Sequence, residues 1–467
     1  MKEYVKEMRA RPLDIEADKL VAILNIKDSK EFGLFPLDRV EIYCPKSKKR
    51  TVCVVDVTKT MVPEGAIGMF RDVQRLLNVK ACGKVKVKVV AAPESVRFIK
   101  KKLDGHSLNE KELKAIVKDL NNNMLSDVEA AAFISAVYIH DFDLQEIVAM
   151  TRALVGQGQK LSFKKKPILD KHCIGGTNGR STMLIVPIVA AAGFYIPKTS
   201  SRSITSAAGT ADSMEVLANV SLSAKEMVKI TEKHGGVIAW GGALELAPVD
   251  DKIIKIEHPF SLDPPGQIIA SVMAKKASAG AKYLVIDMPI GPDVKIQSVE
   301  KAENMAENFI AVGKKLGIKV EVIITDGTEP SGRAFGPSLE AKHVMEILEG
   351  KRFDNLAQKS CELAGVLFEM VGKVKKGKGT HYAKEILLSG DALKKMQAII
   401  KAQGKRALRS EDIKEAPFKK IIKAPQSGEI GKITLKGCAQ LAKLAGAPAN
   451  KLAGLVLFKE EGDRVEK

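Results

Sequence analysis

Three different hydrophobic periodicities follow one another along this chain of 467 residues. Near the N-terminus, Val85, Val87 and Val89 alternate with lysines, which is typical of a half-buried strand. Helical spacing begins after Ala92-Pro93, and from about residue 165 onward short apolar runs alternate with helical segments. At ~100–200 residues per domain, this length corresponds to two to four domains, and the changes in periodicity mark candidate boundaries between them.

We therefore expect a multidomain α/β protein with four parts, which the ~100–200 residues of an ordinary domain allow. The expected parts are a strand-rich N-terminal domain (1–95), a helical domain (96–165), a central mixed α/β domain (166–420) and a C-terminal α+β domain (421–467).

Local patterns predict where individual elements begin. Capping boxes are expected at Ser107–Glu110 and Ser126–Glu129, each followed by an apolar-periodic helix. Buried strands are expected at Tyr283–Asp287 and Val320–Asp326, each followed by a loop that contains glycine or proline. Strands that alternate with helices predict an α/β architecture, in which the loops after the strands carry the chemistry.

The net charge of +19 allows three interpretations: a solvated basic surface, nucleic-acid binding, or a site for polyanionic small molecules. The lysines are spread along the whole chain, which favours a solvated surface. An aromatic content of 5% disfavours a stacking platform for single-stranded nucleic acid.

The cysteines and the N-terminus indicate the compartment. Six cysteines lie scattered without CxxC spacing, which argues against a zinc site or a disulfide framework and favours reduced thiols. The N-terminus has no apolar signal core, and no stretch is long and apolar enough to span a bilayer. We expect a cytoplasmic protein without membrane contact.

Two loops between Asp170 and Asp212 concentrate the chemistry. In the first loop, Asp170–Thr182, glycines allow close approach to an anion, and Lys171 and Arg180 add positive charge. The second loop, Lys198–Asp212, holds many hydroxyl side chains and one arginine, which suit phosphate and ribose oxygens. Taken alone, the first loop could also be a tight structural turn. The second could be an ordinary polar loop or a helix cap, although such a segment is not expected to hold so many hydroxyl groups within ten residues.

The order of several motifs then indicates a family. DKHxxGG, followed by a serine-rich SR loop that ends in GTxD, resembles the thymidine and pyrimidine nucleoside phosphorylase family. The form SRSITSAAGTAD is similar to the archaeal-type AMP phosphorylases within that family. The resemblance covers essentially the whole chain, including a strand-rich N-terminal extension that the pyrimidine enzymes lack, and it continues through Ser261–Pro264, Ala270–Lys276, Met288–Lys295 and Thr325–Arg333.

This resemblance implies phosphorolysis of nucleoside 5′-monophosphates (AMP, with CMP and UMP unranked) to free base and ribose 1,5-bisphosphate. Inorganic phosphate would be the co-substrate, with no metal and no other cofactor. It also implies a homodimer or larger homo-oligomer, paired through the helical domain, that acts on small molecules and not on nucleic acid. Two alternatives stay open: a thymidine or uridine phosphorylase, and a basic RNA-binding protein on an inactive phosphorylase fold.

The resemblance further implies roles for individual residues. Asp263 is the expected proton donor to the departing base; the alternative is that Asp263 caps the helix that starts near Gly266. The residues expected to hold inorganic phosphate are Lys171 and Ser200. Those expected to contact the nucleotide are Gly175, Ser201, Arg202, Ser203, Ile204, Thr205, Ser206, Thr210, Ser271 and Lys295. Arg202 is expected to bind anionic oxygens with both arms of its guanidinium.

The chain departs from the family pattern in two places. Cys173 stands where the family has a hydroxyl side chain, and a thiol is a poorer hydrogen-bond partner for phosphate. The chain also stops at Gly462–Lys467, where family members continue into further strands. We therefore expect a C-terminal domain that is incomplete, or one whose sheet edge another subunit covers.

Overall fold

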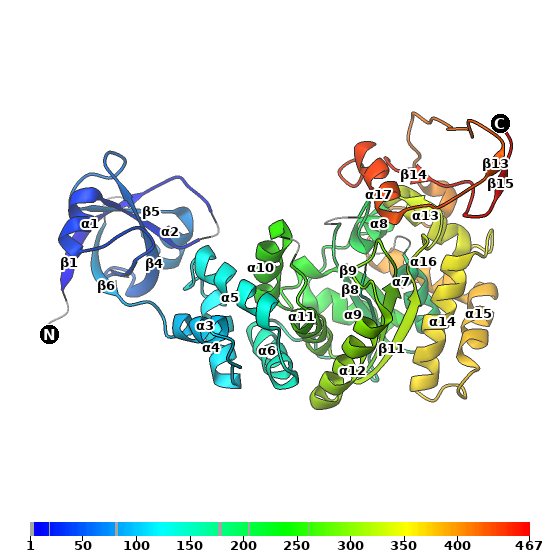
Figure 1. The fold of residues 1–467 in the computed structure, drawn as a ribbon, viewed down its shortest axis with the longest axis horizontal. Coiled ribbons are helices and arrows are strands. Elements are labelled where there is room, and N and C mark those ends of the chain that lie inside the picture. Colours follow the sequence, from blue (N-terminus) through cyan, green and yellow to red (C-terminus); the bar gives the residue numbers. More distant parts are fainter. Residues whose placement is uncertain (1–3, 18, 80–82, 176–179, 204–205, 261) are drawn as a thin grey trace. The chain divides into compact units, whose positions relative to one another are not determined.

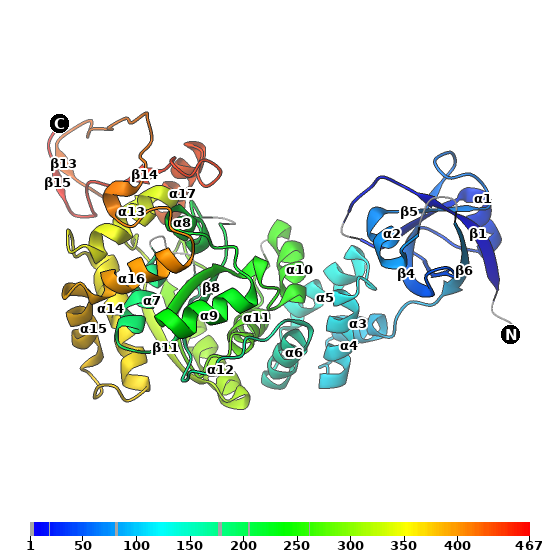
Figure 2. The ribbon, with the colours of Figure 1, turned by 180° about the vertical axis from the view of Figure 1, so that it is seen from behind.

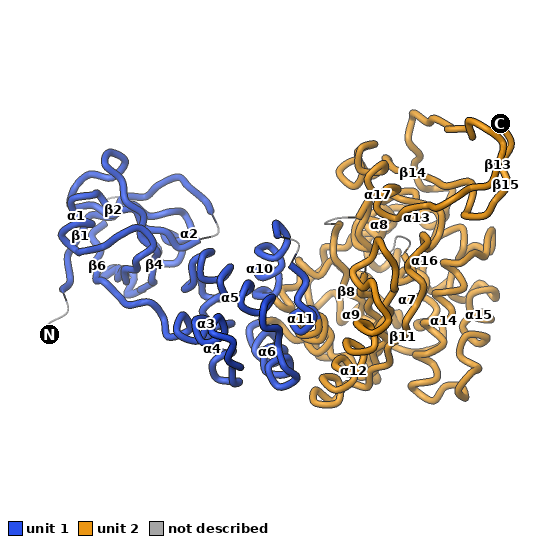
Figure 3. The backbone as a smooth tube through the Cα atoms, viewed as in Figure 1, with its two compact units in different colours: residues 1–157, 248–268 blue, residues 158–247, 269–467 orange. Residues whose placement is uncertain are grey.

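The computed structural model describes residues 1–467 except 1–3, 18, 80–82, 176–179, 204–205 and 261. The chain divides into two compact units (Figure 3). Unit 1 comprises residues 1–157 and 248–268, and unit 2 comprises residues 158–247 and 269–467. Residues 248–268 thus return to unit 1 from within the segment expected to form the central α/β domain.

The strand-rich start of unit 1 is a closed barrel (Figure 1). Its strand order is β1-β5-β2-β4-β3-β6. The strands are β1 (Val5–Pro12), β2 (Val21–Asn25), β3 (Arg39–Cys44), β4 (Lys49–Thr58), β5 (Ala66–Met69) and β6 (Lys84–Val90), with the short helices α1 (Ile26–Phe32) and α2 (Arg71–Leu77) between them. Val85 and Val87 are fully buried, which confirms the predicted strand. Closure leaves the barrel without an exposed sheet edge.

The rest of unit 1 is a helical bundle of α3 (Ser95–Leu103), α4 (Glu110–Asn121), α5 (Asp127–His140), α6 (Leu144–Gln157) and α10 (Pro248–Glu257). The capping box predicted at Ser126 and Glu129 is confirmed at the start of α5. The one predicted from Ser107 is wrong, because Asn109 and Glu112 form the box of α4 two residues later. A buried ion pair of 2.9 Å between Lys102 and Glu146 ties α3 to α6.

Unit 2 is built on five parallel strands: β7 (Leu169–Cys173), β8 (Ile196–Ser200), β9 (Gly236–Trp240), β10 (Tyr283–Ile290) and β11 (Lys319–Asp326). Strands β11, β10 and β7 form one sheet, β8 and β9 form another, and a parallel bridge from Ile168 to Tyr195 joins β7 to β8. The resulting order, β9-β8-β7-β10-β11, is that of a doubly wound α/β fold.

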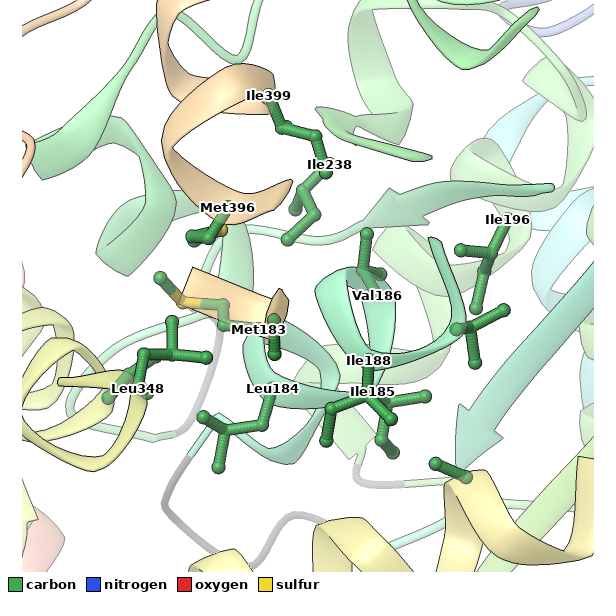
Figure 4. Packing of buried hydrophobic residues seen from close by; sticks show 14 of the residues in the cluster. Met183, Leu184, Ile185, Val186, Ile188, Ile196, Ile238, Leu348, Met396 and Ile399 are labelled. Carbon is green, nitrogen blue, oxygen red and sulfur yellow. The ribbon is translucent and has the colours of Figure 1, made fainter. Parts of the chain in front are cut away.

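Helices surround these strands: α7 (Ser181–Ala191), α8 (Thr210–Leu217), α9 (Ala224–His234), α12 (Val299–Leu316), α13 (Pro337–Leu348), α14 (Asn355–Met370), α15 (Gly379–Leu388) and α16 (Asp391–Ala402). Helix α9 packs on β8 and β9 (Figure 2). Helix α7 is buried on all sides from Thr182 to Ala190. Figure 4 shows its side chains in the core of unit 2: Met183, Leu184, Ile185, Val186 and Ile188, with Ile196, Ile238, Leu348, Met396 and Ile399 around them.

The last part of unit 2 contains α17 (Leu435–Leu444) and short paired strands, β12 (Ala334–Phe335) with β14 (Leu455–Val456) and β13 (Gly428–Glu429) with β15 (Arg464–Val465). Phe335 is buried against Cys438 and Ala442 of α17. Helix α11 (Pro265–Ser278) carries the chain from unit 1 into unit 2. Among the described residues, no helix has both the length and the apolar character needed to cross a membrane.

Candidate functional site

The strand order of unit 2 places a topological switch point at β7. From β7 the chain moves to β8 and β9 on one side, and it then returns to β10 and β11 on the other side. In open parallel sheets, ligands bind outside the carboxyl ends of the strands at such a point. The loops that leave β7 and β10 there contain Gly175 and Lys295, two of the predicted nucleotide contacts.

Gly175 lies two residues after the end of β7 and is tightly packed. Its φ is +154°, and a Cβ atom at this position would lie 2.6 Å from Cγ of Pro289. The same position is 3.7 Å from Cβ of Val294, the neighbour of Lys295. Only glycine fits here, and the loops of Gly175 and Lys295 are therefore adjacent. The Lys295 side chain is exposed.

Lys171 lies on β7 with only 2% of its surface exposed. Its ammonium donates a hydrogen bond of 3.0 Å to Oγ of Ser181, the first residue of α7, and lies 3.2 Å from the Asp287 carboxylate on β10. A lysine at the start of a helix is well placed to hold an anion, because the helix amides there also carry partial positive charge. Phosphate binding by Lys171 stays a prediction.

Asp287 is shared by two lysines. It lies 3.3 Å from Lys359 as well as next to Lys171, and it accepts a hydrogen bond of 2.7 Å from Thr325. Burial tends to raise the pKa of this carboxyl, but the two lysines and the hydrogen bonds from Thr325 and Cys173 lower it to about 2. Asp287 is thus ionised and offsets only one of the two ammonium charges. The Cys173 thiol is directed to Asp287.

A second buried cluster surrounds Asp170, the neighbour of Lys171. Lys276 of α11 lies 2.8 Å from its carboxylate and Lys198 of β8 lies 3.7 Å away. Burial, together with the charge of Lys276, lowers the pKa of Lys198 well below its ordinary value. Across both clusters four lysines face two aspartates, which is a strong local excess of basic groups and suits an anionic ligand.

His172 stands beside these lysines on β7. Burial, followed by the charges of Lys276 and Lys198, holds its pKa well below the ordinary value, so the imidazole is neutral at pH 7. A neutral imidazole that is surrounded by cations cannot serve as a proton donor at that pH. The sequence likewise gave no reason to assign His172 an acid or base role.

Ser200 ends β8, next to β7. Its Oγ is buried and has no hydrogen-bond partner among the residues that the structure describes. An unsatisfied buried hydroxyl costs about 1–3 kcal/mol, so such a group is commonly found where a ligand completes it. The Ser200 hydroxyl is therefore available to an oxygen of a bound anion.

The serine-rich loop that follows Ser200 is folded over the start of α8. Oδ2 of Asp212 accepts hydrogen bonds from the amides of Ser203 (2.7 Å) and Gly209 (2.9 Å). A Cβ on Gly209 would lie 2.5 Å from the carbonyl oxygen of Ser201, so glycine is required there. Thr210 is the first residue of α8. Ser206 bonds the Ala208 carbonyl at 2.8 Å. The predicted contacts Ile204 and Thr205 lie outside the described residues.

Arg202 has a bidentate partner that the sequence analysis did not predict. Its guanidinium bonds both oxygens of Glu215 at 3.0 Å and one oxygen of Asp212 at 3.0 Å, and it lies 4.9 Å from the Trp240 ring centre. Glu215 also pairs with Lys451 at 2.6 Å. Both arms of the fork expected to bind substrate oxygens are thus occupied by α8. Direct contact of Arg202 with nucleotide stays a prediction.

Asp263 lies in unit 1, two residues before α11. The amide of Ile268 donates to the Pro264 carbonyl at 3.0 Å, so Pro264 stands at the cap position. The Gly266 amide donates to Oδ1 of Asp141 at 2.9 Å. Asp141 therefore caps one amide in the first turn of α11. Ser271 lies partly buried in α11.

Two residues central to this geometry were not among the predicted site residues. The sequence analysis did not select Asp287, because it looked like the polar last residue of a buried strand. It did not select Glu215, because this residue lies outside the GTxD motif, three residues after Asp212. The sequence feature that could have identified them is an acidic residue next to apolar ones. In the described part of the chain, no group of three or more His, Cys, Asp or Glu side chains is arranged to hold a metal ion.

Comparison with known proteins identifies the family of this chain and its relatives. Residues 96–158 match the glycosyl transferase family, helical bundle domain, and residues 165–393 match the glycosyl transferase family, a/b domain. The chain is 43% identical to the AMP phosphorylase of Methanothrix thermoacetophila over 98% of its own length and 89% of the relative's. It is 43% identical to the AMP phosphorylase of Thermococcus kodakarensis over 98% and 91% of the two chains.

A solved structure supports the fold. Anthranilate phosphoribosyltransferase from Thermus thermophilus superposes with a TM-score of 0.57 at 21% identity, covering 66% of this chain and 99% of that enzyme. The helical bundle and the α/β domain predicted from the sequence are thus confirmed, together with a strand-rich N-terminal region.

Proposed function

This chain belongs to the AMP phosphorylase family, and from that membership we propose that it cleaves AMP with inorganic phosphate, giving adenine and ribose 1,5-bisphosphate. The structural observation that carries the proposal is the buried cluster of Lys171, Lys359 and Asp287 on β7, α14 and β10, close in the fold to the loop of Gly175. Cleavage of thymidine or uridine is not favoured, because the relatives match over the whole length of the chain, N-terminal barrel included.

The reaction makes three demands on the protein. A phosphate oxygen must be held at the anomeric carbon, the positive charge that develops on the ribose must be stabilised, and the base must be neutralised as the C–N bond breaks. The electron pair of that bond leaves with adenine, which then takes up a proton. No atom changes its oxidation state, so we propose inorganic phosphate as the co-substrate and no further cofactor.

Lys171 and Ser200 are the proposed phosphate ligands. The Lys171 ammonium supplies charge, and the buried Ser200 hydroxyl supplies a donor that lacks a partner in the described structure. Asp263 is the proposed proton donor to adenine. Since Asp141 bonds the Gly266 amide, the first turn of α11 has a cap that does not depend on Asp263.

The remaining roles concern nucleotide binding. Tight packing around Gly175 and Gly209 fixes the backbone of the two loops that we propose to surround the nucleotide. The proposed direct contacts are Gly175, Ser201, Ser203, Ile204, Thr205, Ser206, Thr210, Ser271 and Lys295, and Arg202 is proposed to act through its loop. Arg202 contributes by anchoring its loop to α8 through Glu215.

Wider properties of the protein are proposed on the same basis. We expect a cytoplasmic homodimer or larger homo-oligomer that binds no nucleic acid, with CMP and UMP as further substrates. The proposed division is into four parts, 1–95, 96–165, 166–420 and 421–467. The oligomeric state can be tested by light scattering, where a monomeric mass would contradict the expectation.

The decisive experiment measures phosphate-dependent release of free base. AMP, CMP, UMP, thymidine and uridine are compared at equal phosphate concentration, with a phosphate-free reaction as the control. We expect the monophosphates to be cleaved faster than the nucleosides, and ribose 1,5-bisphosphate to accumulate in step with adenine. Faster cleavage of thymidine or uridine than of AMP would overturn the proposal.

A further inference from the structure

Gln267, the third residue of α11, is buried without satisfying its polar groups. Only 2% of its surface is exposed, and neither Nε2 nor Oε1 has a hydrogen-bond partner in the part of the chain that the structure describes. Each unsatisfied buried polar group costs about 1–3 kcal/mol, whereas an apolar side chain of similar shape would cost nothing of the kind. Folding alone therefore does not account for an amide at this position.

The Gln267 amide contrasts with the buried apolar side chains around it in α11. Its neighbours Ile269, Val272 and Met273 are at most 5% exposed and apolar, as expected for a helix enclosed in a core. Gln267 breaks this pattern in the first turn. Native proteins satisfy the large majority of buried side-chain polar atoms, so a fully unpartnered carboxamide is commonly one that a ligand completes.

Its position along the chain indicates which ligand. Gln267 lies four residues before Ser271, and residues four apart in a helix share one face. It also lies four residues after Asp263, which stands two residues before the helix begins. Along the chain, Gln267 thus lies between the proposed proton donor and a proposed nucleotide contact, and it shares a helix face with the latter.

We infer that the Gln267 carboxamide binds the nucleobase, with Oε1 accepting a hydrogen bond from the exocyclic amino group of adenine and Nε2 donating to the adjacent ring nitrogen N1. This inference rests on the proposed function. A carboxamide makes paired hydrogen bonds of this kind with adenine. The contact occupies the edge that carries N1 and the amino group, so the other ring nitrogens stay accessible to the proton from Asp263.

The same pair of hydrogen bonds would allow the enzyme to bind adenine, cytosine and uracil. Cytosine presents an amino group beside a ring nitrogen acceptor, as adenine does. Uracil presents the reverse pattern, an N–H beside a carbonyl, and a carboxamide rotated by 180° matches it. Gln267 would therefore bind AMP, CMP and UMP alike, and it would discriminate against a base that lacks one partner of the pair.

The test compares AMP with purine riboside 5′-monophosphate, which lacks only the amino group. In the wild-type enzyme, the missing amino group leaves Oε1 of Gln267 without a hydrogen bond, which costs about 1–3 kcal/mol. The kcat/KM for purine riboside 5′-monophosphate should therefore be about 5- to 150-fold lower than that for AMP. In Gln267→Met, which has a similar length and no hydrogen-bonding amide, the two substrates should differ by a factor close to one. Comparing ratios cancels effects of the variant that are common to both substrates.

Ser278→Ala is the matched control. Ser278 lies at the other end of α11 and is also fully buried with an unpartnered Oγ in the described structure, so this variant should keep the wild-type ratio. Gln267→Leu replaces the methionine variant if the latter does not fold, as judged by its melting temperature. An unchanged ratio in a folded apolar variant overturns the inference. A wild-type enzyme that releases no adenine from AMP contradicts the proposed function instead.

Discussion

The Arg202 guanidinium and the Glu215 carboxylate face each other through two hydrogen bonds of 3.0 Å each. Arg202 lowers the pKa of Glu215 to about 2 against the opposing effect of burial, so the pair is ionised at neutral pH. Because Arg202 also bonds Asp212, which holds the amides of Ser203 and Gly209, one side chain connects the serine-rich loop to α8. We expect Arg202 to act on nucleotide binding through the shape of this loop.

Arg202→Lys and Glu215→Gln should therefore have the same effect. Lysine cannot form the two-armed contact, and glutamine lacks the charge that makes it strong. Each variant should raise the KM for AMP by about tenfold, or 1.4 kcal/mol, and the double variant should be little worse than either one. If Arg202 instead binds the nucleotide phosphate directly, Glu215→Gln would free the guanidinium and lower the KM, which steady-state kinetics would detect.

Ser200→Ala should weaken phosphate binding without weakening the fold. A hydrogen bond to a charged group contributes about 1.5–3 kcal/mol, so the KM for phosphate should rise about 10- to 150-fold. The melting temperature should stay level or rise slightly, because an unsatisfied buried hydroxyl is removed.

Ser95→Ala is the matched control for Ser200. Ser95 begins α3 in unit 1, and its Oγ is likewise buried without a partner among the described residues. We expect this substitution to change stability in the same direction while leaving both KM values alone. An unaltered phosphate KM in Ser200→Ala would show that its hydroxyl does not bind phosphate.

Periodicity predicted some elements of this fold well and others poorly. Val85 and Val87 alternate with lysines because one side of β6 faces the barrel core, so the strand was readable from the sequence. The apolar run of α7 gave no such signal. Its side chains are buried in all directions, and a fully enclosed helix shows no period.

For the candidate site, the limit of sequence reasoning was pairing between distant segments. The motif identified Lys171 and the loop after it, because glycine and basic residues suit an anion at any such turn. It could not identify Asp287 or Lys359 as neighbours of Lys171, since both come from strands and helices more than a hundred residues further on. The return of residues 248–268 to unit 1 was hidden for the same reason.

Asp287→Asn should destabilise the protein at neutral pH. Removing one member of a buried ion pair leaves Lys171 and Lys359 without their carboxylate and typically costs about 3–5 kcal/mol. The free energy of unfolding from denaturant titration measures this loss. Asp391→Asn, which removes an exposed partner of Lys394, is the control and should change it far less.

The same carboxylate sets a dependence on pH. The pKa of Asp287 falls from an ordinary 3.8 to about 2 in the folded state, so its contribution is complete above about pH 4 and is lost as the pH falls through 2. The difference in unfolding free energy between wild type and Asp287→Asn should therefore be constant from pH 7 to about pH 4 and shrink below it. A difference that stays constant down to pH 2 would contradict the assigned ionisation.

Asp263→Asn should abolish most of the turnover while nucleotide binding and stability survive. The amide is nearly isosteric but cannot deliver a proton, and general acid catalysis contributes about 100- to 10,000-fold, so single-turnover adenine release should slow within that range.

Asp141→Ala is the counterpart that should affect stability and not turnover. It removes the acceptor of the Gly266 amide, which should lower stability by about 0.5–2 kcal/mol with turnover largely kept. Since Asp and Asn cap helices equally well, a purely structural Asp263 would leave Asp263→Asn nearly as active as wild type. Near-normal turnover in a well-folded Asp263→Asn protein would thus end the proposal that Asp263 is the acid.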